Sequence, residues 1–122
     1  IKKLGDVVEK VLAGKKVNFG SEFRTPGHVA TLRAAKGLIN ERLGQTELSI
    51  ALAKIADVTP AMVVCEMLDD NTGRALSKED AKAYAEKHGM IFIEGSEVIE
   101  AYNIWTTATS IPSEKEIYYN VH

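Results

Sequence analysis

The feature that most constrains the fold of this chain is a short run of apolar residues near its middle, at positions 61–67. The run reads AMVVCEM and follows Thr59-Pro60, a dipeptide that closes a preceding helical pattern. A short apolar run after a turn signal is typical of a strand that is buried on both faces. Because such a strand needs cover on both sides, we expect it to lie inside a sheet with other elements packed against it.

Further strands and several helices are expected around this run. Short apolar stretches at residues 29–32 and 90–93 are predicted as strands, and residues 117–119 are another candidate. Periodicity and capping signals predict four helices: residues 1–13 ended by Gly14, residues 46–56 with Thr46 as N-cap, residues 78–88 opened by Ser77 and Asp80, and a last helix from Ser96 through Tyr102.

This alternation of helices and apolar stretches predicts an α/β (α+β) domain in which helices flank a mixed sheet. We assign residues 1–102 to this domain. Residues 103–122, where the pattern dissolves into Thr, Ser, Pro and aromatic residues, are treated as a tail without an assigned role.

Composition and charge narrow the class of function. Among 122 residues, 45% are hydrophobic and the formal net charge is −2, which argues against a general nucleic-acid or membrane-surface binder, since those carry a basic stripe. The chain has no long apolar run and no signal-peptide pattern, so a cytoplasmic protein is expected. The one cysteine, Cys65, lies in the apolar run and is expected to be buried, and it excludes disulfides and Cys-based zinc sites within one chain.

Residues 24–47 form the first candidate site. Pro26-Gly27 predicts a tight turn that holds the imidazole of His28 at a loop tip. Arg42 and Gly44 come just before the helix expected at residue 46, and the free amides and dipole of a helix start favour an anion such as phosphate. The simpler interpretations, an ordinary turn and a solvated loop, stay open for both motifs.

Glu66 is the second candidate. It stands at the end of the predicted strand, and open α/β sheets bind their ligands at the carboxyl ends of strands. The simpler alternative is a glutamate that reaches solvent. Asp69 and Asp70 follow in an Asx-rich turn that lacks the later Glu of a calcium loop, so we interpret it as a turn.

With these residues in view, the sequence resembles the C-terminal half of 3,4-dihydroxy-2-butanone 4-phosphate synthases, in particular the archaeal ones. The resemblance rests on two stretches, residues 23–70 and 77–102, which contain the motifs RTPGHV, RLGQTE and a glutamate directly after the cysteine. It implies a lyase of riboflavin biosynthesis that converts D-ribulose 5-phosphate to L-3,4-dihydroxy-2-butanone 4-phosphate and formate. It further implies a divalent cation, Mg²⁺ or Mn²⁺, and a homodimer.

The resemblance also implies roles for individual residues. His28 matches the histidine of the PGHV motif and Glu66 the glutamate after the cysteine, and both are expected to be catalytic. The sugar phosphate is expected to bind Glu66 and the segment made up of Arg42, Leu43, Gly44, Gln45 and Thr46. Chemistry agrees, because enolisation next to a carbonyl needs a positioned acid or base and a cation that stabilises the enediolate.

Two departures from the family pattern matter. Where the family has a metal-ligating histidine this chain has Gln45, whose amide oxygen suits magnesium but cannot replace an imidazole in proton transfer. The family's N-terminal half, with its acidic loop containing Arg-Glu, has no counterpart in these residues.

Three hypotheses follow. The first is a synthase whose N-terminal half lies outside this sequence. The second is a non-catalytic relative that binds a sugar phosphate or serves as an interaction module. The third is a split enzyme in which another chain supplies the acidic loop.

Overall fold

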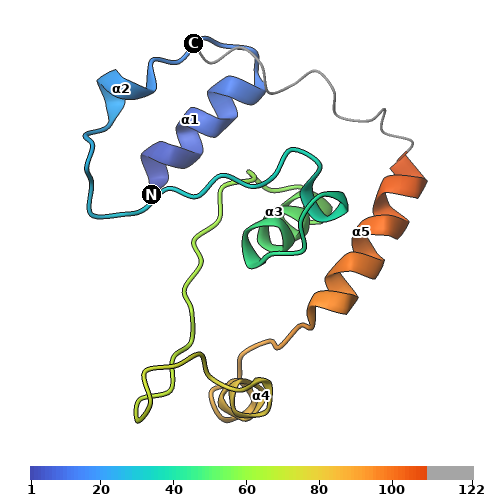
Figure 1. Ribbon diagram of the computed structural model, residues 1–122. Coiled ribbons are helices and arrows are strands. Elements are labelled where there is room, and N and C mark those ends of the chain that lie inside the picture. Colours follow the sequence, from blue (N-terminus) through green and yellow to red (C-terminus); the bar gives the residue numbers. More distant parts are fainter. Residues whose placement is uncertain (110–122) are drawn as a thin grey trace.

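The structure is a computed structural model that describes residues 1–109. Its elements are α1 (Lys2–Leu12), α2 (Phe19–Glu22), the 3₁₀ helix η1 (Leu38–Asn40), α3 (Gln45–Ile55), α4 (Lys78–Lys87) and α5 (Gly95–Thr109). Figure 1 shows α3 near the centre, with α1 and α2 on one side, α5 on the other and α4 at the far end of the molecule. The candidate strand at residues 117–119 lies outside the described residues.

The predicted mixed sheet is wrong. Within residues 1–109 there is no strand, and the only β-type pairing there is an isolated antiparallel bridge between Leu68 and Ala75. Residues 61–67 run as a long single connection away from α3 in Figure 1. Val63 on this connection is 67% exposed, and Ile91 in the stretch at 90–93 is 87% exposed. An apolar stretch favours burial, but it becomes a strand only when a neighbouring strand supplies hydrogen bonds.

The helix predictions are confirmed, with shifted boundaries. Ser77 caps α4 as predicted, because its Oγ accepts a hydrogen bond from the Asp80 amide at 3.1 Å. Thr46 is not a cap, since α3 already starts at Gln45 with Gly44 as its N-cap. Ser96 lies inside α5, where the Glu97 carboxylate instead accepts from the Glu94 amide at 2.7 Å.

α5 also runs further than the periodicity predicted, to Thr109. Trp105 explains the extension, because it packs against the buried core and its ring lies 5.6 Å from that of Tyr102. A helix whose side chains keep finding apolar contacts continues past the point at which its sequence pattern weakens.

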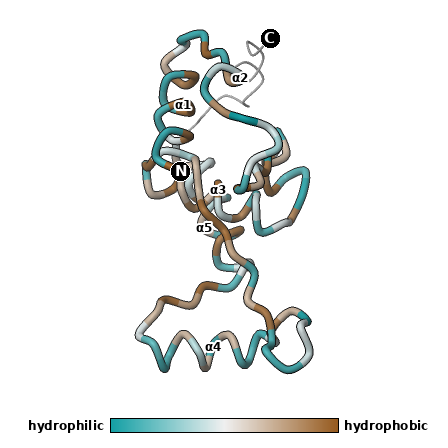
Figure 2. Tube along the Cα trace, turned by 90° about the vertical axis from the view of Figure 1, so that its left-hand side faces the viewer, coloured by the Kyte–Doolittle hydropathy of each residue, from teal (hydrophilic) through white to brown (hydrophobic). Residues whose placement is uncertain are grey.

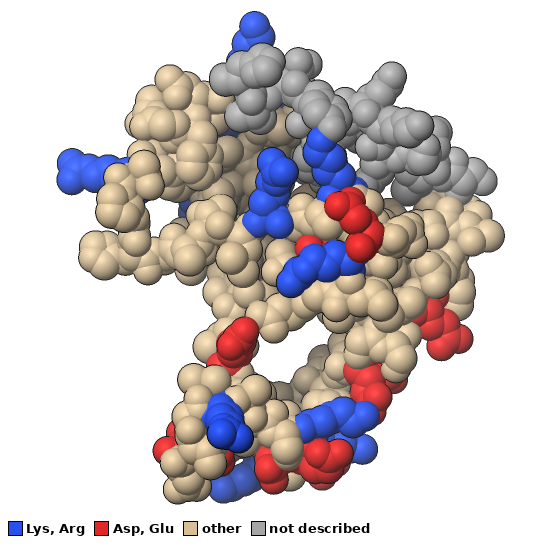
Figure 3. All heavy atoms as spheres, viewed as in Figure 1, with Lys and Arg blue, Asp and Glu red and all other residues tan. Residues whose placement is uncertain are grey.

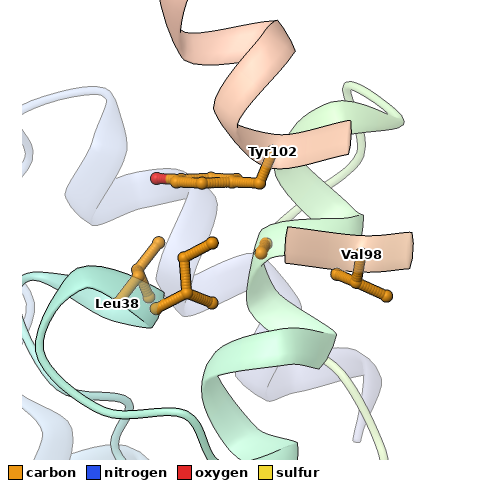
Figure 4. Packing of buried hydrophobic residues seen from close by; sticks show 5 residues of the cluster. Leu38, Val98 and Tyr102 are labelled. Atoms are coloured by element: carbon orange, nitrogen blue, oxygen red, sulfur yellow. The ribbon is translucent and has the colours of Figure 1, made fainter. Parts of the chain in front are cut away.

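The core is small and sits where α3 meets η1 and α5. Figure 4 shows Tyr102 of α5 lying over Leu38 of η1, with Val98 one turn away on α5. The buried members of the cluster are Leu38, Ile39, Ala51, Val98 and Tyr102. This cluster fixes the N-terminal end of α3 relative to η1, and therefore the segment between them that holds Arg42 and Gly44.

The end of the molecule that carries α4 is much more open. Figure 2 shows two connections leading to α4, with hydrophobic residues along both, and Figure 3 shows an opening between them. Lys and Arg side chains mix with Asp and Glu over α4 in the same view. Within residues 1–109 no helix combines the length and the apolarity that crossing a bilayer requires.

Candidate functional site

The site is built around a buried carboxylate in the first turn of α3. Glu47 is 1% exposed, although it is charged. One carboxylate oxygen accepts a hydrogen bond from the Ala35 amide at 2.9 Å, and the other accepts one from Arg42 Nη1 at 2.6 Å. The Ala35 amide, together with the Arg42 guanidinium, holds the pKa of Glu47 below its ordinary value, against the opposing effect of burial. Glu47 is therefore an ionised group that ties α3 to the segment before it.

Sequence reasoning assigned no role to Glu47. The signal that could have found it is its place at the third helical position of α3, where a glutamate meets the positive end of the helix dipole. Arg42 five residues earlier supplies the matching charge. The motif RLGQTE thus contains its own ion pair.

Gly44 has no room for a side chain. A Cβ added there would lie 2.6 Å from Glu47 Oε2 and closer still to Arg42 Nη1. Its φ of −115° is open to any residue, so this glycine is required by the close approach of the ion pair and not by the backbone conformation.

One nitrogen of the Arg42 guanidinium is paired with a buried carboxylate, while most of the side chain is exposed. Its side chain is 64% exposed, whereas that of its partner Glu47 is 1% exposed. Nη1 bonds to Glu47, and the exposed fraction of the side chain shows that much of Arg42 lies at the surface. An arginine held in this way can still offer a fork of N–H groups to an anion.

Gln45 and Glu66, two of the predicted site residues, lie in contact. Gln45 Nε2 donates a hydrogen bond to Glu66 Oε1 at 3.3 Å, across 21 positions of sequence. Both side chains are exposed. Glu66 is thus held beside the start of α3 on an exposed connection, and not at the end of a buried strand. For the same reason the predicted burial of Cys65 is wrong, because this cysteine is exposed.

The other predicted site residues take no part in the contact between Gln45 and Glu66. His28 is exposed and follows the Thr25-Pro26 turn, and no hydrogen bond or ion pair joins it to Gln45 or Glu66 in the part of the chain that the structure describes. Leu43 is 67% exposed, while Thr46 is half-buried and its carbonyl accepts from Ser49 Oγ. The structure therefore brings together Arg42, Gly44, Gln45 and Glu66, and leaves His28 apart.

The donors available to a metal ion are few. No three His, Cys, Asp or Glu side chains of residues 1–109 gather closely enough to hold a cation. Gln45 and Glu66 are the oxygen-bearing pair that remains at the candidate site. Asp69 forms the predicted turn, in which the Thr72 hydroxyl and amide bond its carboxylate at 2.7 and 2.8 Å and lower its pKa.

Comparison with known proteins places this arrangement in a family. Residues 7–101 match the family 3,4-dihydroxy-2-butanone 4-phosphate synthase. The chain belongs to this family. The match spans every residue of the candidate site, so the resemblance drawn from the motifs is confirmed.

Curated synthases of archaea are close in sequence. The chain is 64% identical over 106 residues to the 3,4-dihydroxy-2-butanone 4-phosphate synthase of Methanosarcina acetivorans, covering 87% of this chain and 43% of that protein. It is 63% identical over 105 residues to that of Methanosarcina mazei, covering 86% and 42%. It is 58% identical over 102 residues to that of Archaeoglobus fulgidus, covering 84% and 43%. The chain thus spans less than half the length of these relatives.

Proposed function

We propose that the chain acts as a 3,4-dihydroxy-2-butanone 4-phosphate synthase, a lyase of riboflavin biosynthesis that converts D-ribulose 5-phosphate to L-3,4-dihydroxy-2-butanone 4-phosphate and formate. The observation that carries the proposal is the contact of Gln45 with Glu66 at the start of α3, beside the exposed side chain of Arg42. The high identity to proteins that bear this name adds support.

The phosphate of the substrate would bind at the start of α3. The exposed side chain of Arg42 and the first amides of α3, from Gln45 and Thr46, are complementary to a phosphate group. Leu43 and Gly44 lie between these donors and shape the loop. Binding here would leave the sugar end of the molecule free to reach Glu66.

Proton transfer would fall to Glu66 and His28. The reaction begins with removal of a proton from a carbon next to a carbonyl, and a positioned carboxylate or imidazole can take that proton. Glu66 is held by Gln45, whereas His28 would have to approach when substrate binds, a change that an exposed turn permits.

A divalent cation, Mg²⁺ or Mn²⁺, fits this pair of residues as part of its ligand set. Glu66 can offer a carboxylate oxygen and Gln45 its amide oxygen, and Mg²⁺ commonly takes one or two protein oxygens and completes its shell with substrate and water. When bound, such a cation stabilises the negative charge of an enediolate. Gln45 would have to turn its amide, because in this structure it presents nitrogen to Glu66.

We further propose that the protein is a cytoplasmic homodimer. Support comes from the large apolar side chains exposed on the two connections to α4, since such patches commonly mark protein–protein contacts.

Formate release tests the proposal. The purified chain is incubated with D-ribulose 5-phosphate and MgCl₂, and formate is followed by proton NMR. We expect formate to accumulate, and we expect its release to stop when EDTA is added. Binding of the substrate without formate would instead support a non-catalytic relative.

A further inference from the structure

We propose that Glu47 is a positioning residue: its buried carboxylate fixes the direction in which Arg42 presents its guanidinium to a phosphate, and Gly44 leaves the space that this pairing needs. The inference rests on the proposed function for the identity of the anion. It assigns to Glu47 and Gly44 a task that neither the motif nor the resemblance supplied.

The first step is the burial of Glu47. A carboxylate that is 1% exposed must have partners, because an unpaired buried charge is strongly unfavourable. Its two partners come from different places in the chain, the Ala35 amide before η1 and the Arg42 side chain after it. Glu47 therefore closes the segment 35–47 into one unit that packs on the core through Leu38 and Ile39.

The second step is the effect on Arg42. An exposed arginine normally samples many rotamers and loses that freedom when it binds a ligand. Here Nη1 is held at 2.6 Å by a carboxylate that cannot itself move, so the rest of the guanidinium has a set direction before any ligand arrives. Because Glu47 also offsets the positive charge, its contribution to anion binding is orientation and not charge.

The third step concerns Gly44. A methyl group at this position would meet the far end of the Arg42 side chain and Glu47 Oε2. Glu47 is packed inside, whereas Arg42 is exposed and can swing away. Gly44→Ala is thus expected to displace Arg42 from Glu47 while both charges and the fold are kept.

The test measures binding of inorganic phosphate to the full chain by ³¹P NMR titration, and records melting by circular dichroism. We expect Gly44→Ala to raise the Kd for phosphate about tenfold, a difference of ~1.4 kcal/mol, with the helical signal unchanged. Gly5→Ala is the matched control, since a Cβ at Gly5 meets nothing within 4 Å.

A double-mutant cycle separates positioning from a merely structural role. Arg42→Gln keeps a donor for Glu47 but removes the guanidinium. If Gly44→Ala acts through Arg42, it raises the Kd in the wild-type background and has no further effect in the Arg42→Gln background. Equal effects in both backgrounds would overturn the inference, as would a wild-type chain that binds no phosphate.

Glu47→Asp supplies the second test. Shortening the side chain keeps the charge but withdraws it from Arg42, so phosphate binding should weaken while a control change on the exposed face of α5, Glu100→Gln, leaves it intact. Undiminished binding by Glu47→Asp would contradict the inference. Phosphate binding is read without turnover, so absence of formate would count against the proposed function alone.

Discussion

Two regions of this molecule are packed in opposite ways, and each differs from what its sequence suggested: residues 61–67 were predicted as a buried strand, and a solvated loop was left open for the segment before α3. The segment from Ala35 to Glu47 packs on the core and pairs its charges internally. The connection at residues 61–67 is extended and its apolar side chains are exposed. The difference teaches that a segment forms defined structure when its partners lie close by in the chain, and that an apolar pattern alone does not create a partner.

The largest effect is expected in the core on which the segment from Ala35 to Glu47 packs. Tyr102 is 6% exposed and its ring lies over Leu38 in Figure 4. Tyr102→Ala should lower the free energy of unfolding by ~3–5 kcal/mol, since a large aromatic side chain is removed from a small core. Urea unfolding followed by circular dichroism measures this. Ile104→Ala on the same helix is the control, because Ile104 is 63% exposed; equal losses for the two would mean that this cluster is not the core.

The same substitution made in the core and on the connection at residues 61–67 compares packed and exposed positions directly. Val98→Ser removes a buried valine from α5 and should cost ~2–3 kcal/mol, whereas Val63→Ser on the exposed connection should change stability by less than ~0.5 kcal/mol. Both variants are unfolded in urea under identical conditions. A loss at Val63 as large as that at Val98 would show that the connection is covered in solution.

Acid should weaken the packed region. The pKa of Glu47 is lowered in the folded chain from its ordinary value of 4.5, so its stabilising contribution is complete above that pH and is lost as the pH falls through the lower, folded value. Below about pH 4.5, we expect the urea concentration at the midpoint of unfolding to decrease with falling pH less steeply in Glu47→Gln than in the wild type. Parallel acid profiles for the two proteins would show that Glu47 is not the ionised group described here.

A smaller effect is expected at the cap of α4. Ser77→Ala should cost ~1 kcal/mol because the Asp80 amide loses its acceptor. Ser96→Ala, at the position where a cap was predicted but not found, should be near neutral. Thermal melts of the two variants rank them, and the reverse order would contradict the assignment of both helix starts.

These comparisons show what could be read from the sequence. The start of α4 was predictable, because Ser77 and Asp80 lie three residues apart and satisfy each other locally. The sheet was not, because a strand at residues 61–67 depends on hydrogen bonds from elsewhere. Cys65 was misjudged for the same reason, since burial requires an element that covers it.

The candidate site divides in the same way. Arg42 and Glu66 were singled out from the sequence pattern and Gln45 through the resemblance, yet the contact between Gln45 and Glu66, which lie 21 positions apart, follows no local pattern. Glu47 was overlooked although its motif was in view, because a glutamate at a helix start is ordinarily exposed, and only the packing of Ala35 and Arg42 around it shows that it is buried.

The most direct test of the account compares formate release by Glu66→Gln with that by the wild type, with Glu100→Gln as a matched control on the exposed face of α5. The account predicts that Glu66→Gln lowers the rate about a hundredfold or more, the loss expected when a proton-transfer group is removed, while the control keeps the wild-type rate. Equal rates for Glu66→Gln and the wild type would contradict it.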